Sequence, residues 1–313
     1  MRTAYISHPD CFKHDMGGGH PECAARLNAI EDVLVAANLL PLLQREDAPL
    51  ATLEQLARVH TPHYIASIEA ASPTHGLIYL DSDTAMNPYS WNAARRAAGA
   101  AVLAVELVLQ RKVENAFCAI RPPGHHAGSA RAMGFCIFNN VAVGVAHAMA
   151  KYGLQRVAIA DFDVHHGNGT EQIFRDDPRV MLCSTFQHPY YPYYGADSGN
   201  DHIHNVPLPA GTGGEAFRRA VSEHWLPALD RFQPEMLFCS AGFDAHRDDD
   251  MAQLNLREAD YAWVTQQIKN VADRHAQGRI VSVLEGGYEL HALGHSVLAH
   301  LRVLNGVGVK AGS

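Results

Sequence analysis

Short apolar runs alternate with longer segments of helical periodicity along most of the chain. The runs are rich in Val, Ile, Leu, Phe or Cys and are short enough to be buried strands. They predict strands at 3–7, 116–120, 157–160, 180–184, 236–240 and 280–284. The segments between them predict helices at 22–38, 90–111, 139–152, 215–231, 258–275 and 291–304. This alternation indicates an α/β fold with a parallel sheet covered by helices on both faces.

The chain of 313 residues is 47% hydrophobic and 19% charged, as in an ordinary globular protein. No linker-like stretch, charge block or repeat divides it, so we expect a single domain over residues 1–313. The longest apolar run, at 97–109, contains Glu106 and is too short to cross a membrane. The first residues read as an early strand rather than as a signal peptide.

The formal net charge of -8 and the pI near 6.2 argue against nucleic acid as a main partner, because phosphate binding needs a basic face. An acidic surface suits a cationic amine or a lysine-rich substrate. The six cysteines form no C-x-x-C pair, so we expect a reduced, cytoplasmic protein. The sequence leaves the formation of a homo-oligomer open.

Polar motifs follow four of the predicted strands directly. Arg-Pro-Pro-Gly-His-His begins at Arg121, Asp-Phe-Asp-Val-His-His at Asp161, Ser-Ala-Gly-Phe-Asp at Ser240 and Glu-Gly-Gly-Tyr at Glu285. In open α/β sheets, ligands bind outside the carboxyl ends of the strands. We therefore expect the four motifs to converge on one site.

Asp163 and His165 offer a carboxylate and an imidazole two residues apart. At an extended strand end these side chains point to the same side, so both can reach one ion. Asp244, at another strand end, can supply a third ligand. Two carboxylates and one imidazole suit a catalytic Zn²⁺ that keeps positions open for water and substrate. Helix capping or core hydrogen bonding is the alternative role for such residues.

Together with Gly134-Phe135 and the Gly-Asn-Gly-Thr after His166, these motifs resemble the successive signatures of histone deacetylases. They are similar to the class II branch, which includes bacterial deacetylase-like amidohydrolases and acetylpolyamine amidohydrolases. The resemblance runs from about His20 to Tyr288. It implies a single α/β domain with an eight-stranded parallel sheet flanked by helices, close to the fold of arginase.

The resemblance implies that Asp163, His165 and Asp244 bind one catalytic Zn²⁺. Such an ion lowers the pKa of its bound water and polarises the acyl carbonyl, so that an amide can be attacked near neutral pH. His125 and His126 are expected beside that water. His126 is implied as the general base and then as the acid that protonates the leaving amine, with His125 as its electrostatic partner.

Three further positions complete the implied chemistry. Asp161 and Asn168 match the partners of the two histidines, and Asn at position 168 is the class II pattern. Tyr288 matches the tyrosine that stabilises the oxyanion in the family, which favours true amidase activity. A buried structural tyrosine is the alternative. His166, Glu22 and Arg26 match family positions that we expect to be architectural.

The substrate tunnel is implied by a second group of residues. Phe135, which follows Gly134, matches one tunnel wall, and Tyr191 in the Tyr-Tyr-Pro-Tyr-Tyr segment is the best match for the facing wall. Asp83 matches a rim aspartate that grips the substrate backbone, although Asp81 lies close to it in sequence.

Met251 matches a position at the tunnel mouth where polyamine-specific relatives have a glutamate. A methionine there favours acyl-lysine in peptides or proteins over acetylpolyamines. The resemblance also implies structural K⁺. One set of K⁺ positions comprises Asp161, Asp163, His165, Ser184 and Thr185, and a second comprises Phe174, Asp177 and Val180.

Three other functions remain as alternatives. The first is an amidohydrolase of acetylpolyamines or other small acylated amines. The second is a ureohydrolase with two metals, which would need a further carboxylate where this chain has His246. The third is a non-catalytic module that binds acyl-lysine, although such a module has no need of a proton shuttle.

Overall fold

A computed structural model describes residues 2–307, in which eight parallel strands form one sheet in the order β2-β1-β5-β10-β9-β6-β7-β8. The strands are β1 (Thr3–Ser7), β2 (Gln44–Asp47), β5 (Asn115–Cys118), β6 (Val157–Asp161), β7 (Val180–Gln187), β8 (Ile203–Leu208), β9 (Met236–Ala241) and β10 (Ile280–Leu284). A short antiparallel pair, β3 (Ile78–Tyr79) and β4 (Ala85–Met86), forms a second sheet. The α/β class and the eight-stranded parallel sheet are confirmed. The predicted domain limits at 1 and 313 lie outside the described residues.

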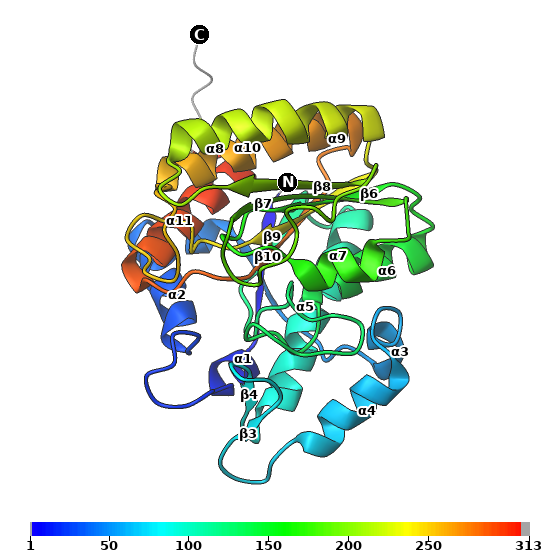
Figure 1. Ribbon diagram of the computed structural model, residues 1–313, viewed down its shortest axis with the longest axis vertical. Coiled ribbons are helices and arrows are strands. Elements are labelled where there is room, and N and C mark those ends of the chain that lie inside the picture. The colour runs from blue at the N-terminus through cyan, green and yellow to red at the C-terminus, as the bar shows by residue number, and fades with distance from the viewer. Residues whose placement is uncertain (1, 308–313) are drawn as a thin grey trace.

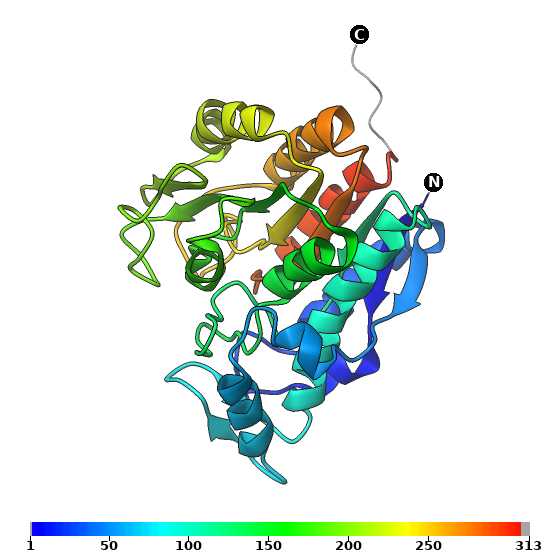
Figure 2. The same ribbon diagram turned by 90° about the vertical axis from the view of Figure 1, so that its right-hand side faces the viewer.

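Helices cover both faces of the sheet (Figures 1 and 2). On one face α2, α10 and α11 pack together, and on the other α5 packs with α6. The helices are α1 (Pro9–Lys13), α2 (Ala25–Ala36), α3 (Leu53–Leu56), α4 (Pro62–Ala71), α5 (Ser90–Leu109), α6 (Asn140–Tyr152), α7 (Asn168–Phe174), α8 (Gly214–Ala220), α9 (Leu226–Phe232), α10 (Glu258–His275) and α11 (Leu290–Leu304), with a 3₁₀ turn at Leu40–Leu42. None of the helices in residues 2–307 is both long and apolar enough to span a membrane.

All the strands that the apolar runs predict are present, with ends shifted by a few residues, but the two edge strands of the large sheet and the β3–β4 pair are additional. The edge strand β2 reads Gln-Arg-Glu-Asp, so it carries no apolar signal at all. It is a strand because its backbone pairs with β1, in a register that places Ala4 opposite Gln44. The other edge strand, β8, contains Pro207, which weakens its strand pattern.

Two of the predicted helices differ from the structure in an informative way. The predicted helix at 215–231 contains a π-helical turn at Val221–Trp225, between α8 and α9. Pro227 lacks an amide N–H, so the regular α-helical hydrogen bonds cannot all be made at this point. The predicted helix at 22–38 begins only at Ala25, and Glu22 stays outside it as part of a buried ion cluster. The helices α1, α3, α4 and α7 were not predicted.

The four strands at the centre of the sheet are consecutive neighbours, in the order β5-β10-β9-β6. One of the four polar motifs begins at or shortly after the end of each of these strands. Because the strands are parallel, their carboxyl ends lie at one edge of the sheet. The fold therefore places segments from four distant parts of the sequence side by side.

A fully buried ion cluster joins the first loop to this edge of the sheet. The Arg121 guanidinium donates to both carboxylate oxygens of Glu22, at 2.5 and 2.7 Å. Arg26 donates to Glu22 at 3.1 Å and also to the carbonyl of Gly287 at 2.6 Å. Burial opposes the charge on Glu22, but the Arg121 guanidinium holds the pKa of this carboxyl at about 2. Because Arg26 binds the Gly287 carbonyl, the cluster also holds the loop that carries Tyr288 in place.

We expect Glu22→Gln to destabilise the fold by about 3–5 kcal/mol, because it leaves two buried guanidinium groups without an anion. The free energy of unfolding in denaturant measures this loss. The matched control is Glu54→Gln, since Glu54 also pairs with an arginine four residues on, at 3.1 Å, but has an 84% exposed side chain. It should cost less than about 1 kcal/mol. Equal losses in the two variants would contradict the importance of the cluster.

Candidate metal centre and active site

Asp163, His165 and Asp244 form the candidate metal centre. One ligand atom from each lies within 4.8 Å of the others, and all three side chains are buried. His165 Nδ1 lies 3.1 Å from Asp163 Oδ1 and 3.2 Å from Asp244 Oδ2. Asp244 Oδ2 is buried without a hydrogen-bond partner of acceptable geometry within residues 2–307. Two carboxylate oxygens and an imidazole nitrogen that converge in this way fit a divalent cation such as Zn²⁺.

The pKa shifts of Asp244 and His165 also fit a metal site. Burial and then the neighbouring charge of Asp163 raise the pKa of Asp244 to about 6. Burial opposes protonation of His165, yet the nearby carboxylates of Asp163 and Asp244 raise its pKa to about 10. The neighbouring carboxylate charge contributes to both shifts. A bound metal ion would satisfy that charge and displace the proton from His165.

Two glycines let the backbone approach these carboxylates closely. Gly286 N donates to Asp163 Oδ2 at 2.8 Å. A Cβ at Gly286 would overlap the Asp244 carboxylate, and a Cβ at Gly242 would overlap that of Asp163. Any larger residue at either position would therefore push the two carboxylates out of place.

His125 and His126 lie beside the metal centre, with ring centroids 4.1 Å apart. His125 Nδ1 lies 2.9 Å from Asp161 Oδ2, and His126 Nδ1 lies 2.8 Å from Asn168 Oδ1. Since both partner atoms are acceptors, each Nδ1 carries a proton and donates it. The Nε2 atom of a neutral histidine in this arrangement is then free to accept a proton.

The two histidines differ in their ionisation. Burial disfavours a charged His125, but the charges of Asp161 and Asp163 outweigh burial and raise its pKa well above the ordinary value. Burial, with the charges of His125 and His165, holds the pKa of His126 well below the ordinary value. His126 is thus the neutral member of the pair and the one equipped to act as a base.

Glu285 supports the histidine pair, a role that the sequence did not suggest. Its buried carboxylate accepts hydrogen bonds from the amides of Gly124 at 2.7 Å and His125 at 3.1 Å. Burial raises the pKa of Glu285 to about 7. The sequence places Glu285 at the start of the Glu-Gly-Gly-Tyr motif, which indicates that it lies near the site. Nothing in the sequence indicates which backbone amides its carboxylate binds.

A cavity of about 290 Å³ opens above the metal centre. Its aromatic walls lead from the surface to His126 and His165. All five residues predicted to bind the substrate border it, together with two tyrosines that were not predicted. The lining residues are Asp83, His126, Gly134, Phe135, His165, Tyr190, Tyr191, Tyr193, Met251 and Tyr288.

The Phe135 ring is held in the cavity by a strained turn. Gly134 and Phe135 have φ of 56° and 67°, and a positive φ is uncommon for a bulky residue. The loop between β3 and β4 fixes this turn, because Asp83 Oδ1 accepts from Gly134 N at 3.0 Å and Thr84 Oγ1 accepts from Phe135 N at 2.9 Å. Asp81 instead pairs with Arg131 at 3.0 Å and does not line the cavity.

The tyrosine-rich segment contributes three rings rather than the single one predicted. Tyr191 meets His126 edge to face, with centroids 5.3 Å apart. Tyr190 lies nearly parallel to the His165 ring, at 6.0 Å and 26°. Tyr193 stands at the mouth and is 75% exposed. The sequence could not separate these roles, because consecutive tyrosines in a loop have no periodicity.

The positions predicted for K⁺ lie around β7. Asp161 and Ser184 are register partners on β6 and β7, next to the metal centre. Phe174, Asp177 and Val180 form successive turns between α7 and β7. His166 is not part of the metal triad, since it bonds to Glu171 at 2.7 Å and to Ser184 at 3.1 Å.

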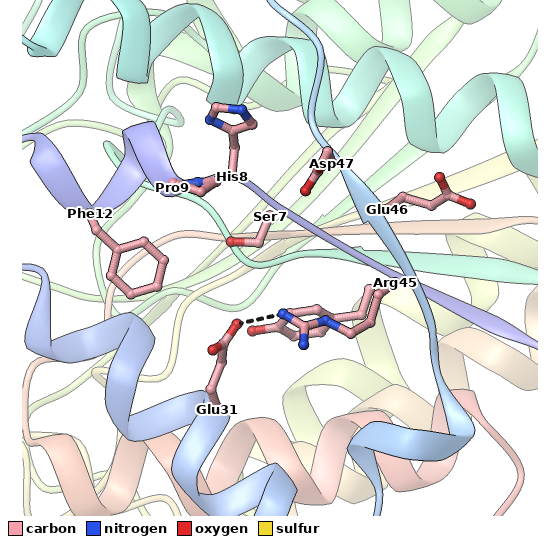
Figure 3. A pocket seen from close by; sticks show the side chains of 9 residues that line it. Ser7, His8, Pro9, Phe12, Glu31, Arg45, Glu46 and Asp47 are labelled. Atoms are coloured by element: carbon pink, nitrogen blue, oxygen red, sulfur yellow. Dashed lines mark ion pairs between the residues drawn. The ribbon is translucent and has the colours of Figure 1, made fainter.

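A larger cavity, of about 730 Å³, lies at the carboxyl ends of β1 and β2 (Figure 3). Glu31 on α2 points toward Arg45 across it, with Nη2 and Oε1 3.6 Å apart. Ser7 and Asp47 also line it. Within residues 2–307, the convergent metal-ligating group is the triad at β6 and β9, and none of its members borders this cavity. The larger cavity is therefore not the candidate reaction site, although its volume is greater.

Comparisons with known proteins agree with this geometry. The model of the histone deacetylase domain matches residues 20–304. The chain is 39% identical, over 92% of its length and 78% of the relative's, to the histone deacetylase-like amidohydrolase of Pseudomonas aeruginosa. It is 37% identical, over 98% of its length and 48% of the relative's, to the mouse polyamine deacetylase HDAC10.

A solved structure gives the same result for the fold. The crystal structure of the HDA15 HD domain superposes with a TM-score of 0.93 at 34% identity, over 99% of this chain and 90% of that one. Relatives of this kind are hydrolytic deacetylases and amidohydrolases, and the buried triad is compatible with their chemistry. The chain belongs to the histone deacetylase family.

Proposed function

We propose that the chain hydrolyses the amide bond of acyl-lysine side chains in peptides or proteins, removing acetyl or related acyl groups with the aid of Zn²⁺. The observation that carries this proposal is the presence of three features in one cavity. These are the buried triad, a histidine kept neutral beside it, and Tyr288. A module that only binds acyl-lysine would have no use for the second feature.

Asp163, His165 and Asp244 would hold the metal ion. When bound, Zn²⁺ would polarise the acyl carbonyl and lower the pKa of water. His126 accepts the proton of the attacking water at Nε2 as the oxygen bonds to the acyl carbon. The same proton then passes to the amine nitrogen as the carbon–nitrogen bond breaks. The charged His125 stabilises the negative charge that develops beside it.

Tyr288 supplies the second electrophile of the proposed site. Its ring lines the cavity next to that of Phe135, with ring centroids 5.8 Å apart and nearly perpendicular planes. Burial raises the pKa of its phenol well above 10, so the hydroxyl keeps its proton and can donate it in a hydrogen bond. A donor aimed at the acyl oxygen stabilises the transition state more than the substrate, because negative charge grows there only during the attack.

The lining of the cavity favours an acylated lysine. Phe135 and Tyr191 offer apolar faces to an extended methylene chain. Met251 at the mouth offers no charge to a second ammonium group, which an acetylpolyamine would bring. The alternative substrate, an acetylpolyamine or other small acylated amine, is suggested by the mouse relative named polyamine deacetylase. The ratio of kcat/KM for an acetyl-lysine peptide to that for an acetylated polyamine separates the two.

We further propose structural K⁺ at the two sets of positions around β7, supported by their family pattern and their grouping in space. A cytoplasmic location is supported by the six cysteines, all of which are free thiols. The acidic net charge supports acylated amines rather than nucleic acid as partners.

We expect metal analysis of the purified protein to find about one Zn²⁺ per chain, because residues 2–307 contain one candidate triad. Asp163→Ala and Asp244→Ala should abolish both bound metal and activity, because each removes one of three ligands. Asp47→Ala, which removes a carboxylate from the larger cavity, serves as the control and should keep both. Full activity without bound metal would contradict the proposal. The same ligand set also fits iron or cobalt, so activity with either metal at the triad agrees with the proposal.

The proton shuttle predicts unequal effects of substituting the two histidines. His126→Ala should lower kcat by about 10²–10⁴-fold, the usual contribution of a general acid–base group, and should retain the metal. His125→Ala should lower kcat far less. Steady-state kinetics with parallel metal analysis test this. Near-normal turnover of the His126 variant would show that another group is the base.

Tyr288→Phe removes only the hydroxyl and should leave the fold and the bound metal intact. The expected loss in kcat is about 10²–10³-fold, as for other single oxyanion donors, with little change in substrate affinity. Kinetics, metal content and thermal unfolding are measured on the same preparation. Unchanged turnover would mean that the metal alone holds the oxyanion, and an unfolded variant would mean that the tyrosine is structural.

A further inference from the structure

The carboxylate of Asp249 binds three backbone amides near the active site. Its Oδ2 accepts from the amides of Tyr288 at 2.6 Å and Glu289 at 3.0 Å. Its Oδ1 accepts from the amide of Met251 at 3.0 Å. Asp249 is only 4% exposed, whereas Asp248 and Asp250 on either side of it are exposed. The middle residue of a run of three aspartates is thus the one turned inward.

The three amides belong to two different loops. Met251 follows β9 and Tyr288 follows β10, and both line the cavity. Met251 is held further, because its carbonyl accepts a hydrogen bond from the Tyr190 hydroxyl at 2.9 Å. One carboxylate therefore binds the backbone amides of two residues that line the cavity. One of these is Tyr288, which we assign as the hydrogen-bond donor to the oxyanion.

Other contacts hold the β10 loop just before Tyr288. Arg26 donates to the carbonyl of Gly287, and Asp163 accepts from the amide of Gly286. After Glu289 the chain enters α11, whose first amides favour a negative charge nearby. Asp249 thus holds the backbone at Tyr288 itself. This position lies between Gly286 and Gly287, which other residues bind, and the start of α11.

We propose that Asp249 is a positioning residue for Tyr288, which keeps the phenol hydroxyl where it can donate to the acyl oxygen. This inference rests on the proposed function. An oxyanion donor must lie within about 2.7–3.1 Å of its acceptor, and a displacement of about 1 Å can cost about 10²-fold in rate. The catalytic geometry is therefore sensitive to the hydrogen bonds that Asp249 makes with the β10 loop.

The test is a double-mutant cycle of Asp249→Asn with Tyr288→Phe, with kcat and KM measured on an acetyl-lysine peptide. The asparagine has the size of the aspartate, but one of its two end atoms is an NH₂ donor. It therefore cannot accept from all three amides, which weakens the connection between the two loops. Alone, it should lower kcat by about tenfold or more and change KM little. In the Tyr288→Phe background the same substitution should have almost no effect, because the hydroxyl that it misplaces is already absent.

Asp248→Asn and Asp250→Asn are the matched controls and should keep normal kcat. A purely structural role for Asp249 would lower kcat by the same factor in both backgrounds, and that additivity would overturn the inference while leaving the proposed function intact. Normal kcat for Asp249→Asn alone would do the same. Full turnover of Tyr288→Phe would overturn the oxyanion role of Tyr288, and with it this inference, but not the proposed hydrolysis.

Asp249→Glu provides a second variant if the asparagine variant does not fold. It keeps the charge and the acceptor atoms but moves them by one methylene. The same loss of effect in the Tyr288→Phe background is expected, and equal losses in both backgrounds would again overturn the inference.

Discussion

Two buried carboxylates, those of Asp163 and Asp244, both lie close to Nδ1 of His165, and the surrounding structure is arranged around their charge. Like charges in a water-poor interior raise each other's energy unless amides, cations or a metal ion compensate them. Backbone amides do part of this, since Val164 N donates to Asp244 at 2.9 Å and Gly286 N donates to Asp163 at 2.8 Å. The glycines at 242 and 286 are needed because only a bare backbone fits against these carboxylates. A divalent cation would supply the remaining positive charge.

The charges around the metal centre also give His125 and His126 different protonation states. His125 lies toward the aspartates and has a carboxylate, Asp161, as its hydrogen-bond partner, so it is held protonated. His126 is buried beside the charges of His125 and His165 and has only the neutral amide of Asn168 as its partner, so it is held neutral. Two adjacent residues of the same type thus acquire opposite protonation states from their burial and from the different charges around them. That difference is what a water-activating site requires.

The sequence predicted much of the fold because the central strands are buried on both faces and therefore appear as apolar runs. It failed where structure depends on hydrogen bonding rather than burial, as in the polar edge strand β2. The π turn before Pro227 was likewise invisible to periodicity. The candidate site was predictable in outline because its motifs directly follow strands, and the resemblance to deacetylases assigned roles to most of its residues.

The residues that the sequence missed act through contacts that cross the fold. Glu285 and Asp249 each bind backbone amides of another loop, and no local pattern indicates which amides those are. Tyr190 and Tyr193 owe their roles to the path of one loop across the cavity.

Anomalous X-ray diffraction from crystals of the active enzyme, measured on both sides of the zinc absorption edge, tests the metal centre most directly. If the triad binds the catalytic metal, one peak should lie between Asp163, His165 and Asp244. The ligand atoms should then lie at about 2.0–2.2 Å from it, as in other zinc sites with nitrogen and oxygen ligands. A peak at any other place in a fully active crystal, or none at this one, would contradict the assignment of the catalytic centre.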